Sequence, residues 1–101
     1  MKDNNQELNI ELTEDVAPGV FSNLALINHS PSEFIVDFIQ VMPGMPKAKV
    51  RSRVILTPQH AKRLLKAMAE NLQKFEQHFG EIKDNDSPNF PINFGAPQGE
   101  A

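Results

Sequence analysis

The sequence predicts an α+β fold, in which a four-stranded antiparallel sheet with meander topology is followed by one long C-terminal helix. Two observations predict it. In the first half of the chain, apolar and polar residues alternate in short runs separated by proline, glycine and serine, as in strands joined by turns. In the second half, apolar residues recur every three or four positions, as on one face of a helix.

Three strands are expected before the middle of the chain. In residues 8–12 every second residue is apolar, which is typical of a strand with one solvated face. Ala17-Pro18-Gly19 ends this run, and the apolar segments at 20–28 and 33–42 supply the second and third strands. In the third of these, Phe34, Val36 and Phe38 share a face.

The segment NHSPSEF, residues 28–34, separates the second strand from the third. His29, Ser30, Ser32 and Glu33 together raise the alternative of a nucleophile with its base. Pro31 lacks an amide hydrogen, and serine side chains bond to neighbouring backbone groups, so a turn explains the same residues. Because no G-x-S-x-G motif is present, we favour the turn.

The fourth strand is expected at 49–56, after a hairpin turn in MPGMP (42–46), whose Pro-Gly pair suits a type II turn. Strict alternation places Val50, Ser52, Val54 and Leu56 on one face and Arg51 and Arg53 on the other. Across the hairpin, Asp37 falls opposite Arg51 or Arg53, on the wetter face.

Thr57 and Pro58 predict the start of a helix, since threonine caps helices and proline is favoured at the first position, and Gly80 predicts its end. The helix from about 58 to 80 is ~34 Å long, more than the width of four strands. A second copy of the chain would cover the excess, so we expect a homodimer, with Leu72, Phe75, Phe79 and Ile82 in its interface. The apolar face has heptad-like spacing and comprises Ala61, Leu65, Met68, Leu72, Phe75, Phe79 and Ile82.

With 101 residues, the chain is expected to form one domain at 7–82, preceded by a flexible N-terminus at 1–6. Residues 83–101 are rich in proline and glycine, and we expect most of them to be disordered. Within them the alternating Phe90, Ile92 and Phe94 could dock on a groove or sheet edge. The composition is 40% hydrophobic and 23% charged, and there is neither a spanning apolar run nor a signal peptide, so we expect a cytoplasmic chain that does not enter a membrane.

Charge is unevenly distributed along the chain. Between Asp37 and Glu70 there is no acidic residue, yet the interval holds seven of the ten lysines and arginines. Two alternatives remain: the cations pair internally, with Glu33 and Asp37, or they bind an external anion such as a nucleic acid. The candidate anion-binding residues are Arg51, Arg53, Lys62, Arg63 and Lys66.

Catalysis is not expected. The chain has no cysteine, which excludes thiol chemistry and thiolate metal sites. His60 and His78 are five helical turns apart on one helix and cannot share a metal. Neither a phosphate-binding glycine loop nor a carboxylate pair is present, so we predict no catalytic residue, no metal and no cofactor.

The segments SNLALINHSPSEFIVDFIQVMPG and KVRSRVILTPQHAKRLLKAMAENLQKFEQHFGEI, with their spacing, resemble the bacterial and archaeal family called domain of unknown function 3467. This resemblance implies no established activity. The order of strands then helix is also similar to the SecB-like chaperone fold, whose members bind unfolded chains on apolar grooves. We therefore expect a homodimeric adaptor or chaperone-like protein-binding module, with nucleic-acid binding through residues 47–66 as the alternative.

Overall fold

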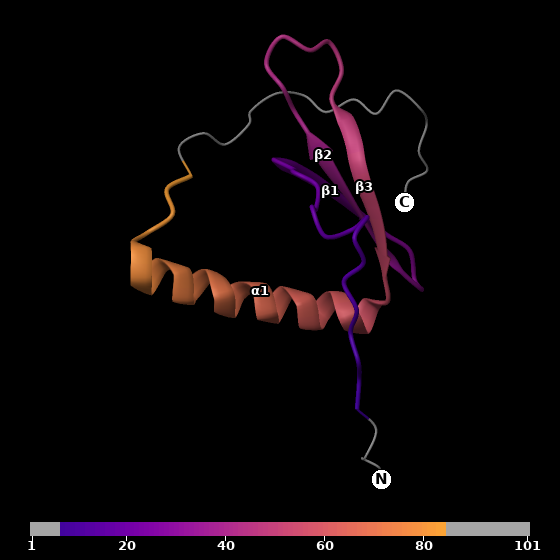
Figure 1. Cartoon of the computed structure of the whole chain (residues 1–101), viewed down its shortest axis with the longest axis vertical. Coiled ribbons are helices and arrows are strands. Elements are labelled where there is room, and N and C mark those ends of the chain that lie inside the picture. Colours follow the sequence, from indigo (N-terminus) through magenta and orange to yellow (C-terminus); the bar gives the residue numbers. More distant parts are fainter. Residues whose placement is uncertain (1–6, 85–101) are drawn as a thin grey trace.

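The computed structural model describes residues 7–84, so the predictions for residues 1–6 and for the tail from 85 onward, including Phe90, Ile92 and Phe94, lie outside it. Three strands and one helix follow one another (Figure 1): β1 (Leu24–His29), β2 (Phe34–Gln40), β3 (Lys49–Leu56) and α1 (Pro58–Phe79). The strands form one antiparallel sheet in the order β1-β2-β3. The α+β class and the C-terminal helix are confirmed, whereas the prediction of four strands is wrong.

The missing strand is the one expected at residues 8–12, which form no regular structure. Alternation shows that a segment can pair, but a strand also needs a neighbour for its backbone groups. The only backbone hydrogen bonds described before Asn23 close a turn: Val16 and Ala17 donate to the carbonyl of Thr13 (3.2 and 2.9 Å), and Gly19 donates to that of Val16 (2.9 Å). This turn reverses the chain before β1, which begins at Leu24 rather than at residue 20.

The register of β2 with β3 contains a β-bulge. Phe38 lies opposite Ser52, but the next residue, Ile39, lies opposite Val50, so that Arg51 is the extra residue. Val50 consequently shares a face with Ile39 and not with Ser52 and Val54, contrary to the strict alternation assumed from the sequence. The reason is that one inserted residue reverses the facing of everything beyond it.

Both turns within the sheet are confirmed. Ser30 donates its amide to the carbonyl of Glu33 at 2.9 Å, which closes the connection of β1 to β2. In the second hairpin Met45 donates to the carbonyl of Met42 at 3.2 Å, and Gly44 has a φ of 84°. A positive φ at the third position is what a type II turn requires.

The ends of α1 also form as the sequence predicts. The hydroxyl of Thr57 accepts the amide of His60 at 3.1 Å, and Pro58 begins the helix. Gly80 ends it, with a φ of 95° and its amide donating to the carbonyl of Glu76 at 2.9 Å. Ile82 therefore lies beyond the helix, where its amide donates to the Glu76 carboxylate at 3.0 Å.

Burial within one chain is confined to the centre of the sheet. Among residues 7–84, the buried side chains all belong to β2: Val36, Asp37 and Ile39. Helix α1 has no buried residue; it crosses the end of the sheet and projects beyond it (Figure 1). On the apolar face of the helix, Leu65, Met68, Leu72 and Phe75 are exposed, because in residues 7–84 the strands pack on one another and not along the helix.

Candidate functional site

The two faces of the sheet differ in character, because residues opposite each other in adjacent antiparallel strands share a face. One face, here called the apolar sheet face, has Ile27, Val36 and Val54 side by side at its centre. Ile27, which the sequence analysis did not single out, is 63% exposed. The remainder of this face comprises Ala25, Phe38 and Ser52 toward one end, with Gln40 and Lys49 beyond them, and His29, Phe34 and Leu56 toward the other.

The opposite face has an ion pair at its centre. Arg53 lies across from Asp37 and donates from Nε to Oδ1 at 2.6 Å and from a terminal nitrogen to Oδ2 at 2.8 Å. Asp37 is 0% exposed, whereas the Arg53 side chain remains 59% exposed. The hydrogen bonds from Arg53 lower the pKa of Asp37 against the opposing effect of burial. The pairing is confirmed, but the expectation of a wet environment is wrong, because Asp37 occupies the middle of the central strand.

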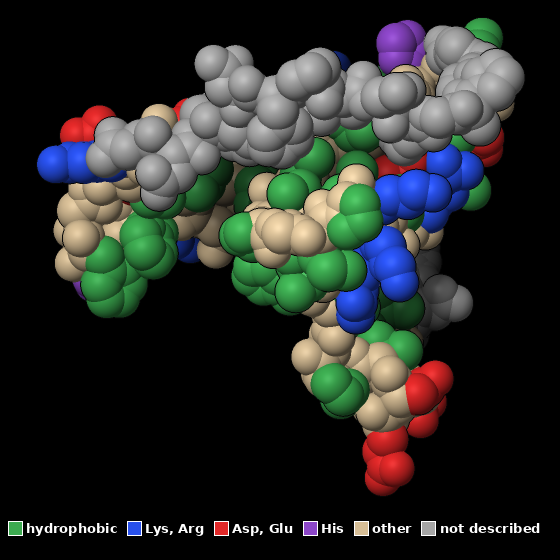
Figure 2. All heavy atoms as spheres, turned by 90° about the horizontal axis from the view of Figure 1, so that it is seen from above, with side chains coloured by type: hydrophobic (Ala, Val, Ile, Leu, Met, Phe, Trp, Pro, Cys, Tyr) green, Lys and Arg blue, Asp and Glu red, His purple; other side chains and the backbone are tan. Residues whose placement is uncertain are grey.

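The most extensive uncovered surface is the apolar face of the helix, which we call the α1 stripe: Ala61, Leu65, Met68, Leu72, Phe75 and Phe79. From Leu65 to Phe79 its members are between 47% and 76% exposed. The rings of Phe75 and Phe79 pack one turn apart with centroids at 4.9 Å. Figure 2 shows hydrophobic side chains exposed over the sheet, at the far end of α1 and on the segment that projects from the sheet.

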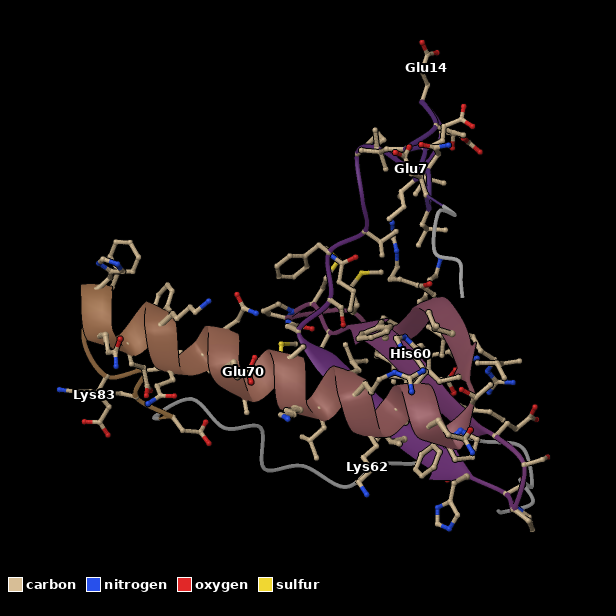
Figure 3. All side chains as sticks on the ribbon, turned by 90° about the horizontal axis from the view of Figure 1, so that it is seen from below. Glu7, Glu14, His60, Lys62, Glu70 and Lys83 are labelled. Carbon is tan, nitrogen blue, oxygen red and sulfur yellow. The ribbon has the colours of Figure 1, made fainter. Side chains whose placement is uncertain are left out.

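The structure separates the candidate anion-binding residues into two sets. Arg53 is occupied by Asp37, and Arg51 donates to the side-chain oxygen of Gln40 at 3.3 Å. Within the described range no ion pair is recorded for the helix cations Lys62, Arg63 and Lys66, which are exposed. The internal pairing predicted from the charge pattern is therefore confirmed for Arg53 and Asp37. In Figure 3 Lys62 and His60 lie on different sides of the helix.

A third uncovered region, missed by the sequence analysis, precedes the sheet. Residues 7–12, which we call the N-terminal arm, project away from the sheet, and Glu7 and Glu14 lie near the end of the projection (Figure 3). Leu8 and Ile10 are both 85% exposed. The sequence analysis identified the alternation of this segment. It did not indicate that the segment would lack a strand partner among residues 7–84.

The turn residues first considered as a catalytic group bond locally. Ser30 and Ser32 hydroxyls lie 3.4 Å apart, and the Ser30 hydroxyl also accepts the Ser32 amide at 3.3 Å. The His29 ring stacks on Phe34, with centroids 5.4 Å apart, and no bond to either serine is recorded. In residues 7–84 no three histidine, aspartate or glutamate side chains gather as a metal site would require.

These features define a small α+β chain in which many of the large apolar side chains of residues 7–84 are exposed. The chain belongs to the family described as Protein of unknown function (DUF3467), whose model matches residues 1–84. No curated protein and no solved structure matches it, so the similarity to the SecB-like fold stays a prediction. Over the part of the chain that the structure describes, no helix is long and apolar enough to cross a membrane.

Proposed function

We propose that the protein is a non-enzymatic protein-binding module that acts as a homodimer. The observation that carries the proposal is the α1 stripe, which a 22-residue helix presents without one buried residue. Fully burying one leucine or phenylalanine side chain contributes about 1.5–3 kcal/mol. Leaving the stripe in water would forgo much of the ~5–15 kcal/mol that stabilises a small domain.

A second copy of the same chain is the occupant that fits the stripe. Its spacing of four and three residues from Ala61 to Phe79 forms the seam of paired helices. No charged residue lies within the seam, and a twofold axis brings equal seams together. Pairing α1 with α1 in this way leaves the sheet available for another partner.

The apolar sheet face is the surface that would bind another polypeptide. Its centre carries no lysine, arginine, aspartate or glutamate, and its one charged residue, Lys49, lies opposite Gln40 at one end. Ile27 and Val54 remain exposed. A face with an uncharged centre suits apolar segments of a protein partner, including an unfolded one, better than it suits phosphates.

Nucleic-acid binding is the second candidate, supported by the exposed cations Lys62, Arg63 and Lys66 in the first half of α1, whose first turn contains no acid. Positive charge is unfavourable near a helix N-terminus, so an external phosphate would relieve it. The pairing of Arg53 with Asp37 removes one of the five cations from this role. Such binding would weaken steeply with salt because each contacted phosphate releases counterions.

Light scattering on the full chain provides the first test. A homodimer will scatter as twice the 11.3 kDa of one chain at micromolar concentration. A mass equal to one chain across that range contradicts the dimer.

Binding to a permanently unfolded, reduced and carboxymethylated polypeptide provides the second test. We expect Ile27→Asp to weaken this binding at least fivefold without changing the mass of the assembly. Ile55→Asp is the matched control, because Ile55 is 58% exposed but lies on the face of Asp37. Equal loss in both variants, or binding to DNA or RNA that decreases steeply with salt, contradicts the assignment of the apolar sheet face.

A further inference from the structure

The sheet has an open edge along β3. In the order β1-β2-β3, β3 has a neighbour on one side only, and its outward backbone groups have no recorded partner in residues 7–84. An open edge is a template for another strand, and natural proteins cover it or protect it with charge. This edge carries Lys49, Arg51 and Arg53, so two copies of β3 placed side by side would bring like charges together.

The N-terminal arm has the complementary pattern. Leu8, Ile10 and Leu12 alternate with Glu7, Asn9 and Glu11, and no backbone hydrogen bond to the arm is recorded in the described part of the chain. Figure 2 shows acidic side chains at the end of a projecting segment, and lysine and arginine side chains gathered beside the sheet. The arm thus has the sequence of a strand but no recorded strand partner, and β3 has one edge with no recorded strand partner.

We propose that the N-terminal arm of one copy adds to the open edge of β3 in the second copy as its fourth strand. The proposal rests on the homodimer proposed above and assigns the arm a role in it. Strand addition of this kind satisfies backbone groups on both partners, and side chains on alternate positions set its specificity.

The apolar and polar faces of the arm and of β3 match in only one alignment parity, in which even-numbered residues lie opposite even-numbered residues. From Ser52 to Leu56, beyond the bulge, Arg53 and Ile55 share the face of Asp37, and the even-numbered residues share the apolar sheet face. Placing even-numbered arm residues opposite even-numbered β3 residues aligns Leu8, Ile10 and Leu12 with Val54 and its neighbours. The same placement sets Glu7 and Glu11 on the side of Arg53, next to the bulge that contains Arg51. A slip of one residue would exchange the two sets and set apolar side chains against the arginines.

The arm reaches this edge more readily in a partner than in its own chain. It enters the sheet through β1, and β2 separates β1 from β3. The turn at residues 13–19 holds the arm pointing away from its own sheet (Figure 3). The other open edge, that of β1, offers no charge complementarity, since LALINH contains no lysine or arginine.

Disulfide trapping tests the parity directly, because the natural chain has no cysteine. One set of tagged chains carries Leu8→Cys, Ile10→Cys or Leu12→Cys, and untagged chains carry Val54→Cys. We expect at least one of the three to form the mixed disulfide roughly tenfold faster than the matched controls Asn9→Cys and Glu11→Cys. Equal rates for odd and even positions overturn the proposal, as does faster trapping of Val54→Cys by a cysteine at Ile92, which would place the tail on this edge.

Charge exchange provides a second readout in full-length chains. Glu7→Lys with Glu11→Lys, or Arg51→Glu alone, should weaken association roughly tenfold, because attraction across the strands becomes repulsion. Mixing the two variants should restore it. Arg51 is chosen because it contacts Gln40, whereas changing Arg53 would leave Asp37 without its partner. If the natural chain is a dimer and the charge changes do not alter its association, arm exchange is overturned but the homodimer is not. If the natural chain is a monomer, the homodimer itself is contradicted.

Discussion

Strand β2 and helix α1 are stabilised in opposite ways. At the centre of β2, Val36, Asp37 and Ile39 are buried by the neighbouring strands, and the buried carboxylate has both oxygens bonded to Arg53. Helix α1 has a threonine cap, a proline at its start and a glycine at its end, but none of its residues is buried. Within residues 7–84 the sheet centre is therefore stabilised by tertiary packing, whereas the helix is stabilised mainly by local signals.

This contrast explains why an apolar stripe persists on a surface. A helix in isolation is marginal even when its sequence favours it, and most helical stability in proteins comes from packing of the apolar face. Under the proposed function, the six residues of the α1 stripe stabilise association rather than the fold of one chain. The variants below separate the two kinds of stability.

The largest effect is expected for Phe79→Asp, which should raise the dissociation constant of the homodimer by about 100-fold or more. A twofold interface contains the residue twice, and each buried aromatic side chain contributes about 1.5–3 kcal/mol. Sedimentation at a series of concentrations measures it. Gln77→Asp is the control, since it adds the same charge near the same helix end outside the stripe. Equal weakening by both variants would assign the effect to charge at the helix end and not to the stripe.

The next effect concerns the sheet centre. Asp37→Ala should lower the free energy of unfolding by about 2 kcal/mol, because it removes the acceptor of two charge-assisted hydrogen bonds. Urea unfolding at neutral pH, extrapolated to a common protein concentration, measures the change. Asp15→Ala is the control, because the Asp15 carboxylate accepts the Thr13 hydroxyl at 2.6 Å in an exposed turn. Loss of less than about 0.5 kcal/mol on changing Asp37 would show that the pair is not what holds the centre.

The same pair predicts a dependence on pH. The pKa of Asp37 is lowered below its ordinary value of 3.8, so the folded chain binds this proton less readily than the unfolded chain. The stabilisation is thus fully present above that ordinary value and is lost as the pH falls through the lower pKa of the folded state. The gap in unfolding free energy between the natural chain and Asp37→Asn should narrow as the pH is lowered through this interval. A gap that stays constant down to the acid limit of folding contradicts the assignment.

What the sequence predicted correctly was local. The cap at Thr57, the stop at Gly80, the turn at Pro43-Gly44 and the pairing of Asp37 with Arg53 depend on residues close in the chain or joined by one hairpin. Two failures concern partners: among residues 7–84, residues 8–12 pair with no strand, and Leu65 and Phe75 are not buried by the sheet. Alternation and heptad spacing indicate that an apolar face must be covered, but they do not indicate which segment or which copy of the chain covers it.

The prediction of strict alternation in β3 failed at Arg51 for a different reason. The inserted residue changes the face on which Val50 lies, but the residue pattern of KVRSRVIL does not indicate where a bulge occurs. The exposed Ile27 was overlooked for a related reason: in LALIN both alternating sets are apolar, and only the register with β2 decides which set lies with Val36.

A smaller effect is expected at the start of the helix. Thr57→Ala should lower the free energy of unfolding by about 1 kcal/mol, because the His60 amide loses its acceptor. Thr57→Ser retains a hydroxyl and should restore most of the loss. The helical signal in circular dichroism, followed through urea unfolding, measures both. If Thr57→Ala instead dissociates the homodimer as strongly as Phe79→Asp, the separation between local and intermolecular stabilisation of α1 is wrong.

The smallest effect is expected in the turn between β1 and β2. Ser30→Ala removes a hydroxyl that accepts the Ser32 amide at the long distance of 3.3 Å, in a turn that is also closed by a backbone bond of 2.9 Å from Ser30 to Glu33. Because the backbone bond remains, the free energy of unfolding should change by about 0.5 kcal/mol or less. Binding to unfolded polypeptide should be unchanged, since the bonds recorded for this serine stay within the turn. Labelling with a fluorophosphonate probe checks the chemistry independently: a nucleophilic serine would react, whereas a turn serine, whose neighbour His29 stacks on Phe34 instead of bonding to it, stays unlabelled.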